Sequence, residues 1–139
     1  MPDLRVRPKE RDDSGAVLEV TPESAGWTYV GFKVLKLDPG ESAGGGESAR
    51  EACIIVLSGR CDVEVGGQRF ENIGRRMSVF EDAPPAAVYA PAGALYAITA
   101  RTPLEVAIGS APGQGGGEAR LIPSDRISRE TRGQGTNTR

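Results

Sequence analysis

The sequence of 139 residues contains no histidine, only two cysteines and only seven aromatic residues, namely three Phe, three Tyr and Trp27. Without an imidazole, the chain cannot form a Ser–His–Asp or Cys–His catalytic arrangement or a histidine-based metal site. Two cysteines, Cys53 and Cys61, are too few for the disulfide framework of a secreted protein, which favours a cytoplasmic location. The scarcity of aromatic residues means that Val, Ile, Leu and Ala must build the core.

The chain also lacks long apolar runs and a strong charge of either sign. No stretch approaches 18 consecutive apolar residues, so no membrane-spanning helix is expected, and the first residues do not resemble a signal peptide. Seventeen basic and nineteen acidic residues give a net charge of −2. This balance does not favour nucleic acid or an anionic membrane as a partner.

Glycine and proline are abundant instead, with 19 and 10 copies. They separate short segments rich in β-branched or alternating apolar residues, a pattern typical of an all-β sandwich or barrel. About nine strands are predicted, at 16–21, 29–37, 52–57, 61–65, 68–73, 74–81, 87–90, 95–100 and 104–108. Residues 121–123 offer one further short strand, no convincing helix is predicted, and 41–48 is expected to be a polar loop.

The segment 52–57 is the most apolar of the predicted strands. A helix over 48–57 is the alternative, because Ser48 and Glu51 have the spacing of a capping box. As a strand, the segment is apolar on both faces, so a second layer or a partner subunit must cover it, and we expect a homodimer. In total, residues 1–122 are predicted to form one barrel domain with a loose arm at 1–14, and residues 123–139 a linker or disordered tail.

Glycine and proline spacing resembles that of the cupin superfamily of small metal-binding barrels. Gly40 and Gly59 match the ends of the first cupin motif, and Pro91 and Gly93 match the second. The resemblance implies a double-stranded β-helix, or jelly-roll, barrel. The positions that hold metal ligands in cupins are here Gly46, Ser48, Ala52 and Tyr96, a set without imidazole or carboxylate donors. No metal or other cofactor is therefore expected in this chain.

A closer resemblance is to the 5-deoxyglucuronate isomerases of inositol catabolism, relatives of the 4-deoxy-5-ketouronate isomerases. It rests on TPESAGWTYVGF at 21–32, LSG at 57–59, VYAPAG at 88–93 and RGQGTNTR at 132–139. These segments are similar to the N-terminal half of that two-cupin family. The resemblance implies an aldose–ketose isomerisation that uses a divalent metal held in the second half. It assigns no catalytic residue to this chain, which is predicted to be a structural and assembly module that pairs with a second cupin domain or subunit.

Two other functions remain open on the residues alone. A stand-alone cupin could bind a small sugar acid through a pocket of Ser48, Arg50 and Tyr96. A metal-free isomerase would use Tyr96 and Glu51 as acid and base. Arg50 and Glu51 are alternatively a solvated pair.

Two residue types also have more than one interpretation. Trp27 either stacks on a sugar or packs in the core or an interface. Cys53 and Cys61 are either buried structural thiols or a soft-metal or redox pair.

Overall fold

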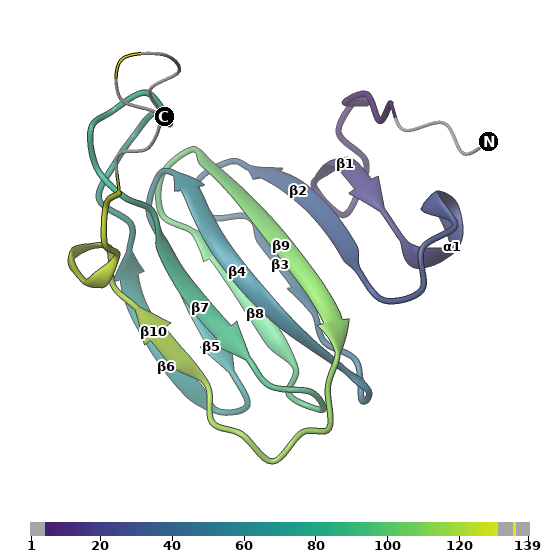
Figure 1. Cartoon of the computed structure of the whole chain (residues 1–139). Helices are drawn as coiled ribbons and strands as arrows, with labels where there is room; N and C mark the ends of the chain where they lie inside the picture. The colour runs from purple at the N-terminus through teal and green to yellow at the C-terminus, as the bar shows by residue number, and fades with distance from the viewer. Residues whose placement is uncertain (1–4, 131–134, 136–139) are drawn as a thin grey trace.

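Two antiparallel sheets pack against each other in the computed structural model, which describes residues 5–130 and residue 135 (Figure 1). The six-stranded sheet has the order β1-β2-β9-β4-β7-β10 and the four-stranded sheet the order β3-β8-β5-β6. The strands are β1 (Ala16–Val20), β2 (Gly31–Leu37), β3 (Ser42–Gly45), β4 (Arg50–Ser58), β5 (Cys61–Val65), β6 (Gln68–Ile73), β7 (Ala86–Ala90), β8 (Tyr96–Ala100), β9 (Leu104–Pro112) and β10 (Arg120–Ile122). The predicted all-β jelly-roll class is confirmed.

The core lies between the two sheets. Successive side chains of a strand point to opposite faces, so every second residue of β4 and β9 enters the core. Ile54 and Val106 from the six-stranded sheet meet Val63 and Ile98 from the four-stranded sheet, and all four are fully buried. Each such aliphatic side chain contributes about 1.5–3 kcal/mol by leaving water, so a core of aliphatic residues suffices without aromatic ones.

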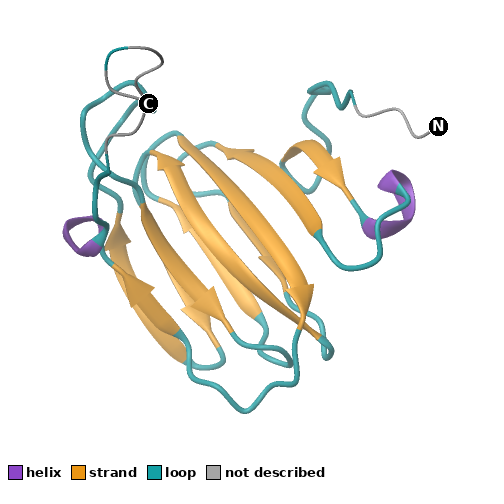
Figure 2. Cartoon of the chain, in the orientation of Figure 1, coloured by secondary structure: helices purple, strands orange, loops and turns teal. Residues whose placement is uncertain are grey.

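Within residues 5–130, helical structure is limited to two single turns (Figure 2). Helix α1 (Pro22–Ala25) begins at Thr21, whose side chain accepts a hydrogen bond from the Ser24 amide at 3.0 Å, while the Ser24 hydroxyl accepts one from the Thr21 amide at 2.9 Å. This reciprocal capping satisfies two backbone N–H groups at the start of the turn. The second turn is the 3₁₀ helix η1 (Ser124–Arg126). Among the described residues, no helix is long and apolar enough to cross a membrane.

Three local predictions are resolved by the strand assignments. The segment over 48–57 is strand β4, so the helical alternative is wrong. The segment 41–48, predicted as a loop, contains strand β3, which pairs with β8. The strand predicted around Met77, Val79 and Phe80 is absent, and these side chains are exposed in a turn.

Part of the arm predicted at 1–14 is hydrogen-bonded to the barrel. The amides of Lys9 and Asp12 donate to the carbonyls of Val17 and Ala16 at 2.7 and 3.1 Å. At the other end, β10 adds to the edge of the six-stranded sheet through β7, as the short strand near 121–123 predicted. The RGQGTNTR segment at 132–139 lies almost wholly outside the described residues.

Candidate ligand-binding cavity

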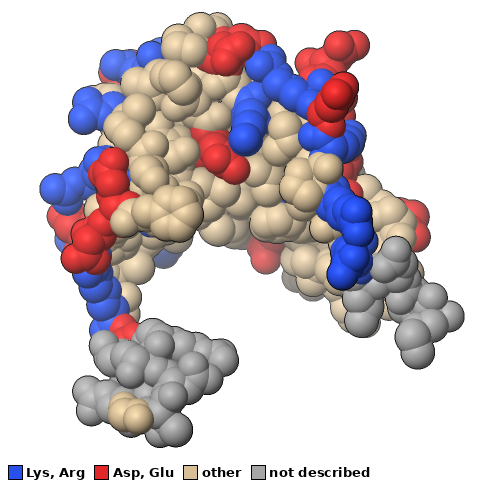
Figure 3. Space-filling model, turned by 90° about the horizontal axis from the view of Figure 1, so that it is seen from above, with Lys and Arg blue, Asp and Glu red and all other residues tan. Residues whose placement is uncertain are grey.

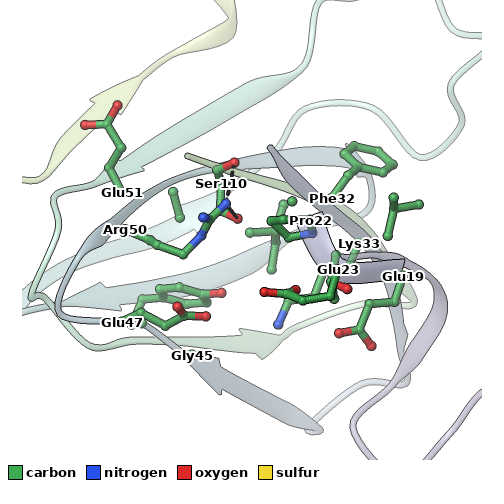
Figure 4. A pocket seen from close by; sticks show the side chains of 17 residues that line it. Glu19, Pro22, Glu23, Phe32, Lys33, Gly45, Glu47, Arg50, Glu51 and Ser110 are labelled. Carbon is green, nitrogen blue, oxygen red and sulfur yellow. Dashed lines mark hydrogen bonds between the residues drawn. The ribbon is translucent and has the colours of Figure 1, made fainter. Parts of the chain in front are cut away.

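A cavity of about 340 Å³ opens at one end of the barrel, where β2, β4 and β8 begin and β9 ends (Figure 4). Its lining combines backbone, apolar and charged groups from both sheets. The residues that line it are Glu19, Val20, Thr21, Pro22, Glu23, Gly31, Phe32, Lys33, Gly45, Gly46, Glu47, Arg50, Glu51, Ala52, Tyr96, Ile108 and Ser110. A cavity of this size accommodates a small molecule of several heavy atoms.

The guanidinium of Arg50 joins three strand ends at this cavity. Its Nη2 atom donates to the carbonyl oxygen of Tyr29 at 2.7 Å and to the carbonyl and hydroxyl oxygens of Ser110 at 3.2 Å each. Gly31 allows this approach, because a Cβ there would lie 2.7 Å from the Ser110 hydroxyl oxygen. Arg50 therefore holds the start of β4 against β2 and β9, and part of its hydrogen-bonding capacity is used within the protein.

Tyr96 forms the inner wall of the cavity. Its side chain is only 7% exposed, and a Cβ added at Gly45 would collide with its ring and hydroxyl. Burial, with a smaller contribution from the negative charge of Glu47, raises the pKa of Tyr96. The phenol therefore stays protonated at neutral pH and can donate one hydrogen bond to a ligand.

Charged residues that the sequence did not single out complete the cavity. Lys33 lies across from Glu19 in the register of β1 and β2, and Glu23 and Glu47 also line the cavity. Among the described residues Lys33 forms no salt bridge. Two cations, Lys33 and Arg50, thus surround the opening with the carboxylates of Glu19, Glu23 and Glu47, in addition to Glu51. Their convergence follows from the pairing of β1 with β2, which no local motif in the sequence indicates.

The candidate residues from the sequence are only partly brought together. Gly46, Ala52, Arg50 and Tyr96 line the cavity, whereas Ser48 is exposed and does not line it. The metal-ligand positions of the cupin pattern therefore supply one phenol and no carboxylate. Among the described residues, no group of three His, Cys, Asp or Glu side chains is placed to hold a metal ion.

Glu51 does not face Tyr96. Figure 4 shows its side chain pointing away from the other lining residues, and its carboxylate accepts a hydrogen bond from the Tyr89 hydroxyl at 2.7 Å. Alternation along β4 explains this, because Arg50 and Ala52 point inward and the residue between them must point outward. The acid–base pair of Tyr96 and Glu51 is therefore not assembled.

Trp27 and the two cysteines also lie away from the cavity lining. Trp27 is 48% exposed and borders a separate shallow hollow formed by residues 26–30. Cys53 is half-buried and Cys61 is in the core, and both thiols are free. Burial, and to a lesser extent the charge of Asp62, raises the pKa of Cys61 to about 12, which keeps that thiol protonated and unreactive.

Comparison with known proteins places the fold and the family. Bacillus subtilis oxalate decarboxylase shares the fold, with a TM-score of 0.56 at 16% identity over 81% of this chain and 29% of that chain. An IolB-like protein from Salmonella typhimurium LT2 is more similar, with a TM-score of 0.86 and 40% identity over 91% of this chain and 48% of that one.

Curated relatives give the same result. The 5-deoxy-glucuronate isomerase of Geobacillus thermodenitrificans is 45% identical over 124 residues, and that of Bacillus subtilis strain 168 is 37% identical over 123 residues. Each match covers 88–89% of this chain but 45% of the relative, so the chain spans somewhat less than half the length of these relatives. The KduI/IolB family description matches residues 4–139. The chain is thus a member of the KduI/IolB family.

Proposed function

We propose that this chain is the metal-free part of a 5-deoxy-glucuronate isomerase-like protein, a structural and assembly module with no isomerase activity by itself. The observation that carries the proposal is the composition of the cavity. At the cupin ligand positions it presents Gly46, Ala52 and Tyr96, with Ser48 outside the lining, and the chain has no histidine to replace them. These donors do not fit a divalent metal of the kind that polarises a sugar carbonyl.

In this proposal the isomerisation, in inositol catabolism, needs groups from a second barrel that bears histidine and glutamate. Moving a proton between C1 and C2 of an open-chain sugar acid requires a base at the carbon and an electrophile at the carbonyl oxygen. The phenol of Tyr96 supplies a hydrogen-bond donor only, and Glu51 lies on the opposite face of β4. The proposal includes a cytoplasmic location, which the scarcity of cysteine supports.

The test is an isomerase assay on the purified 139-residue chain with 5-deoxyglucuronate, with and without added zinc, manganese or iron. We expect no turnover above the buffer rate and no stoichiometric metal by elemental analysis. Turnover that disappears on chelation and returns with metal would overturn the proposal. Turnover that survives chelation but is lost in Tyr96→Phe would overturn it in favour of metal-free chemistry.

A second candidate function is the binding of a small sugar acid without catalysis. Arg50 and Tyr96 line the same cavity, and Lys33 adds an ammonium group without an ion pair among the described residues. A ligand that binds the folded state raises its apparent melting temperature. Glucuronate and galacturonate should therefore raise the melting temperature of the wild type and not of Lys33→Met, while Lys36→Met on the outer surface serves as the control. Equal melting temperatures with and without uronates would reject this function.

A further inference from the structure

The outer faces of the two sheets differ in chemical character. On the four-stranded sheet, Ser42, Thr99 and Asp62 form one row across β3, β8 and β5. The hydroxyls of Ser42 and Thr99 lie 2.9 Å apart, and Asp62 forms ion pairs with Arg69 and Arg101. This is the polar outer face expected where an antiparallel sheet meets water.

The outer face of the six-stranded sheet is apolar across its whole width. The register of its strands aligns one residue from each into a single row, and on β2, β9, β4 and β7 each member is followed or preceded by a core residue of its own strand. This first row is Leu18, Val34, Ala107, Ile55, Ala87 and Ile122, without a polar side chain. The neighbouring row is Val20, Phe32, Gly109, Cys53, Tyr89 and Arg120, with its only charge at the end. We call these two rows the apolar face.

The apolar face is accessible in the single chain. Phe32 and Ile122 are each 38% exposed, and Val34, Cys53, Ile55 and Tyr89 are half-buried. The smaller Ala87 and Ala107, and Val20 at the end of β1, are buried. An exposed apolar face of this extent on a sheet whose counterpart is polar indicates a surface that another protein covers. The view in Figure 3 shows Lys and Arg interspersed with Asp and Glu around uncharged surface. Other exposed apolar side chains, among them Tyr29, Phe80 and Leu95, lie outside these two rows.

We infer that a second copy of this chain covers the apolar face, so that two six-stranded sheets pack against each other. The sizes of the side chains in the first row support packing between two copies of the chain. From Val34 to Ile122 large and small side chains alternate, with Ala107 and Ala87 on either side of Ile55. A shift by one strand seats Ile55 of one copy over an alanine of the other, the arrangement that lets two layers interdigitate.

The charges at the margins of the face are also compatible with a second copy. Beyond one end of the rows, Lys36 and Glu105 are register partners on β2 and β9. Beyond the other end lies the outward-facing Glu51, and Arg120 ends the second row beside Tyr89. Acidic and basic groups are therefore both present around the face, and a two-fold partner can place an acid of one copy opposite a base of the other.

The size of the face fits a stable dimer. Six strands about 4.8 Å apart, with the two rows and both margins spaced about 6.8 Å along the strands, cover roughly 30 Å by 25 Å with the side-chain widths included. This flat footprint is of the same order as the roughly 800 Å² of accessible surface that each partner buries in a standard stable interface. The apolar face is therefore the surface through which we expect the predicted homodimer to form.

The experiment measures the mass of the full chain by sedimentation equilibrium over a range of concentrations. The chain has a mass of 14.6 kDa, and the wild type should show twice that value. Ile55→Glu places a carboxylate in the middle of the first row and should give the monomer mass. Ala97→Glu is the matched control, because Ala97 is an exposed strand residue on the polar sheet, and this variant should remain a dimer.

Cys53 provides a second measurement that does not depend on a variant folding. It lies in the second row of the apolar face, whereas Cys61 is in the core. Labelling of Cys53 with a maleimide should slow at least tenfold at concentrations where the dimer forms, and Cys61 should stay unlabelled throughout. A monomeric wild type with Cys53 labelled at one rate at every concentration would overturn the inference and leave the face to another protein, such as the second barrel. An Ile55→Glu variant that folds and stays dimeric would also overturn it.

Discussion

The phenol ring of Tyr96 occupies the space that a side chain at Gly45 would need. A Cβ at that position would lie within 3.0 Å of three atoms of the ring and hydroxyl. Gly45 has an ordinary backbone conformation, so its role is to leave room and not to adopt an unusual φ. The pairing of β3 with β8 places the two residues opposite each other, and the inner wall of the cavity depends on this contact.

Gly45→Ala should therefore destabilise the protein by about 1–3 kcal/mol through overpacking. Chemical denaturation monitored by circular dichroism measures this loss. Gly44→Ala is the matched control, because a Cβ at that neighbouring strand glycine meets nothing nearer than the Tyr96 carbonyl oxygen at 3.4 Å. Adding Tyr96→Ala to Gly45→Ala should cost less than the sum of the two single changes, since the collision is absent in the double variant. Strict additivity would contradict the steric argument.

The bonds of Arg50 predict a second effect on stability. Arg50→Met removes the donor that serves the carbonyls of Tyr29 and Ser110. The expected loss is about 1–3 kcal/mol, because both carbonyls lose a charged donor and that of Ser110 is half-buried. Ser110→Ala removes only the hydroxyl acceptor and should cost less, about 1 kcal/mol or below. Urea denaturation of both variants measures the two losses in unfolding free energy. A larger loss for Ser110→Ala than for Arg50→Met would contradict the role of Arg50 in holding β4 against β2 and β9.

The two thiols should differ sharply in reactivity. Burial raises the pKa of Cys61 to about 12, and it also raises the pKa of Cys53, which is only half-buried. In the folded protein at pH 8, at most one thiol per chain should react with a disulfide reagent, and two should react in urea. Cys53→Ala should remove the reaction of the folded protein altogether. Two reactive thiols in the folded wild type would place Cys61 outside the core.

Sequence patterns predicted the parts of this fold in which local chemistry and tertiary structure agree. The hairpin of β5 and β6 turns at Gly66 and Gly67, both with positive φ, as the glycine pair indicated. Strand β4 followed from its β-branched residues, and pairing with β7 and β9 on either side completes its backbone hydrogen bonds.

Predictions failed where distant contacts decide the conformation. Strand β3 lies in a glycine-rich segment without apolar alternation and exists because β8 pairs with it. The apolar segment around Met77 is a turn, because Arg76 donates to the carbonyls of Leu57 at 2.7 Å and Ala83 at 2.8 Å and so holds both sides of the loop. No local period encodes either effect.

The same limit applies to the cavity. The sequence pointed to Arg50 and Tyr96 because Tyr96 occupies a ligand position of the cupin pattern and Arg50 lies between two others, Ser48 and Ala52. Lys33 and Glu19 were missed because only the register of β1 with β2 places them at the opening. Ser48 lies next to a marked position in the sequence, but its side chain lies outside the lining.

Lowering the pH should reduce the folding stability of the barrel, because the carboxylate of Asp62 becomes protonated. Burial by itself raises the pKa of this carboxyl group, but hydrogen bonds from Arg101 at 2.7 Å and from the Asn72 amide at 2.8 Å, with the nearby charges, outweigh it. The pKa in the folded state is therefore below the ordinary value of 3.8. For a carboxyl group with a lowered pKa, the stabilisation is complete well above pH 3.8 and is lost as the pH falls through the folded-state pKa.

Asp62→Asn should thus cost about 1–2 kcal/mol at pH 7, a value reduced for partial solvent screening, and much less near pH 3. Urea denaturation at pH 7, 5, 4 and 3 measures the difference between variant and wild type at each value. Asp82→Asn is the control for the loss of one negative charge, since the Asp82 side chain is 91% exposed and its only ion pair, with Arg129, lies at the surface of the described part of the chain. A cost of Asp62→Asn that stays constant from pH 7 to pH 3 would mean that shape, and not charge, is what this position contributes to the polar sheet.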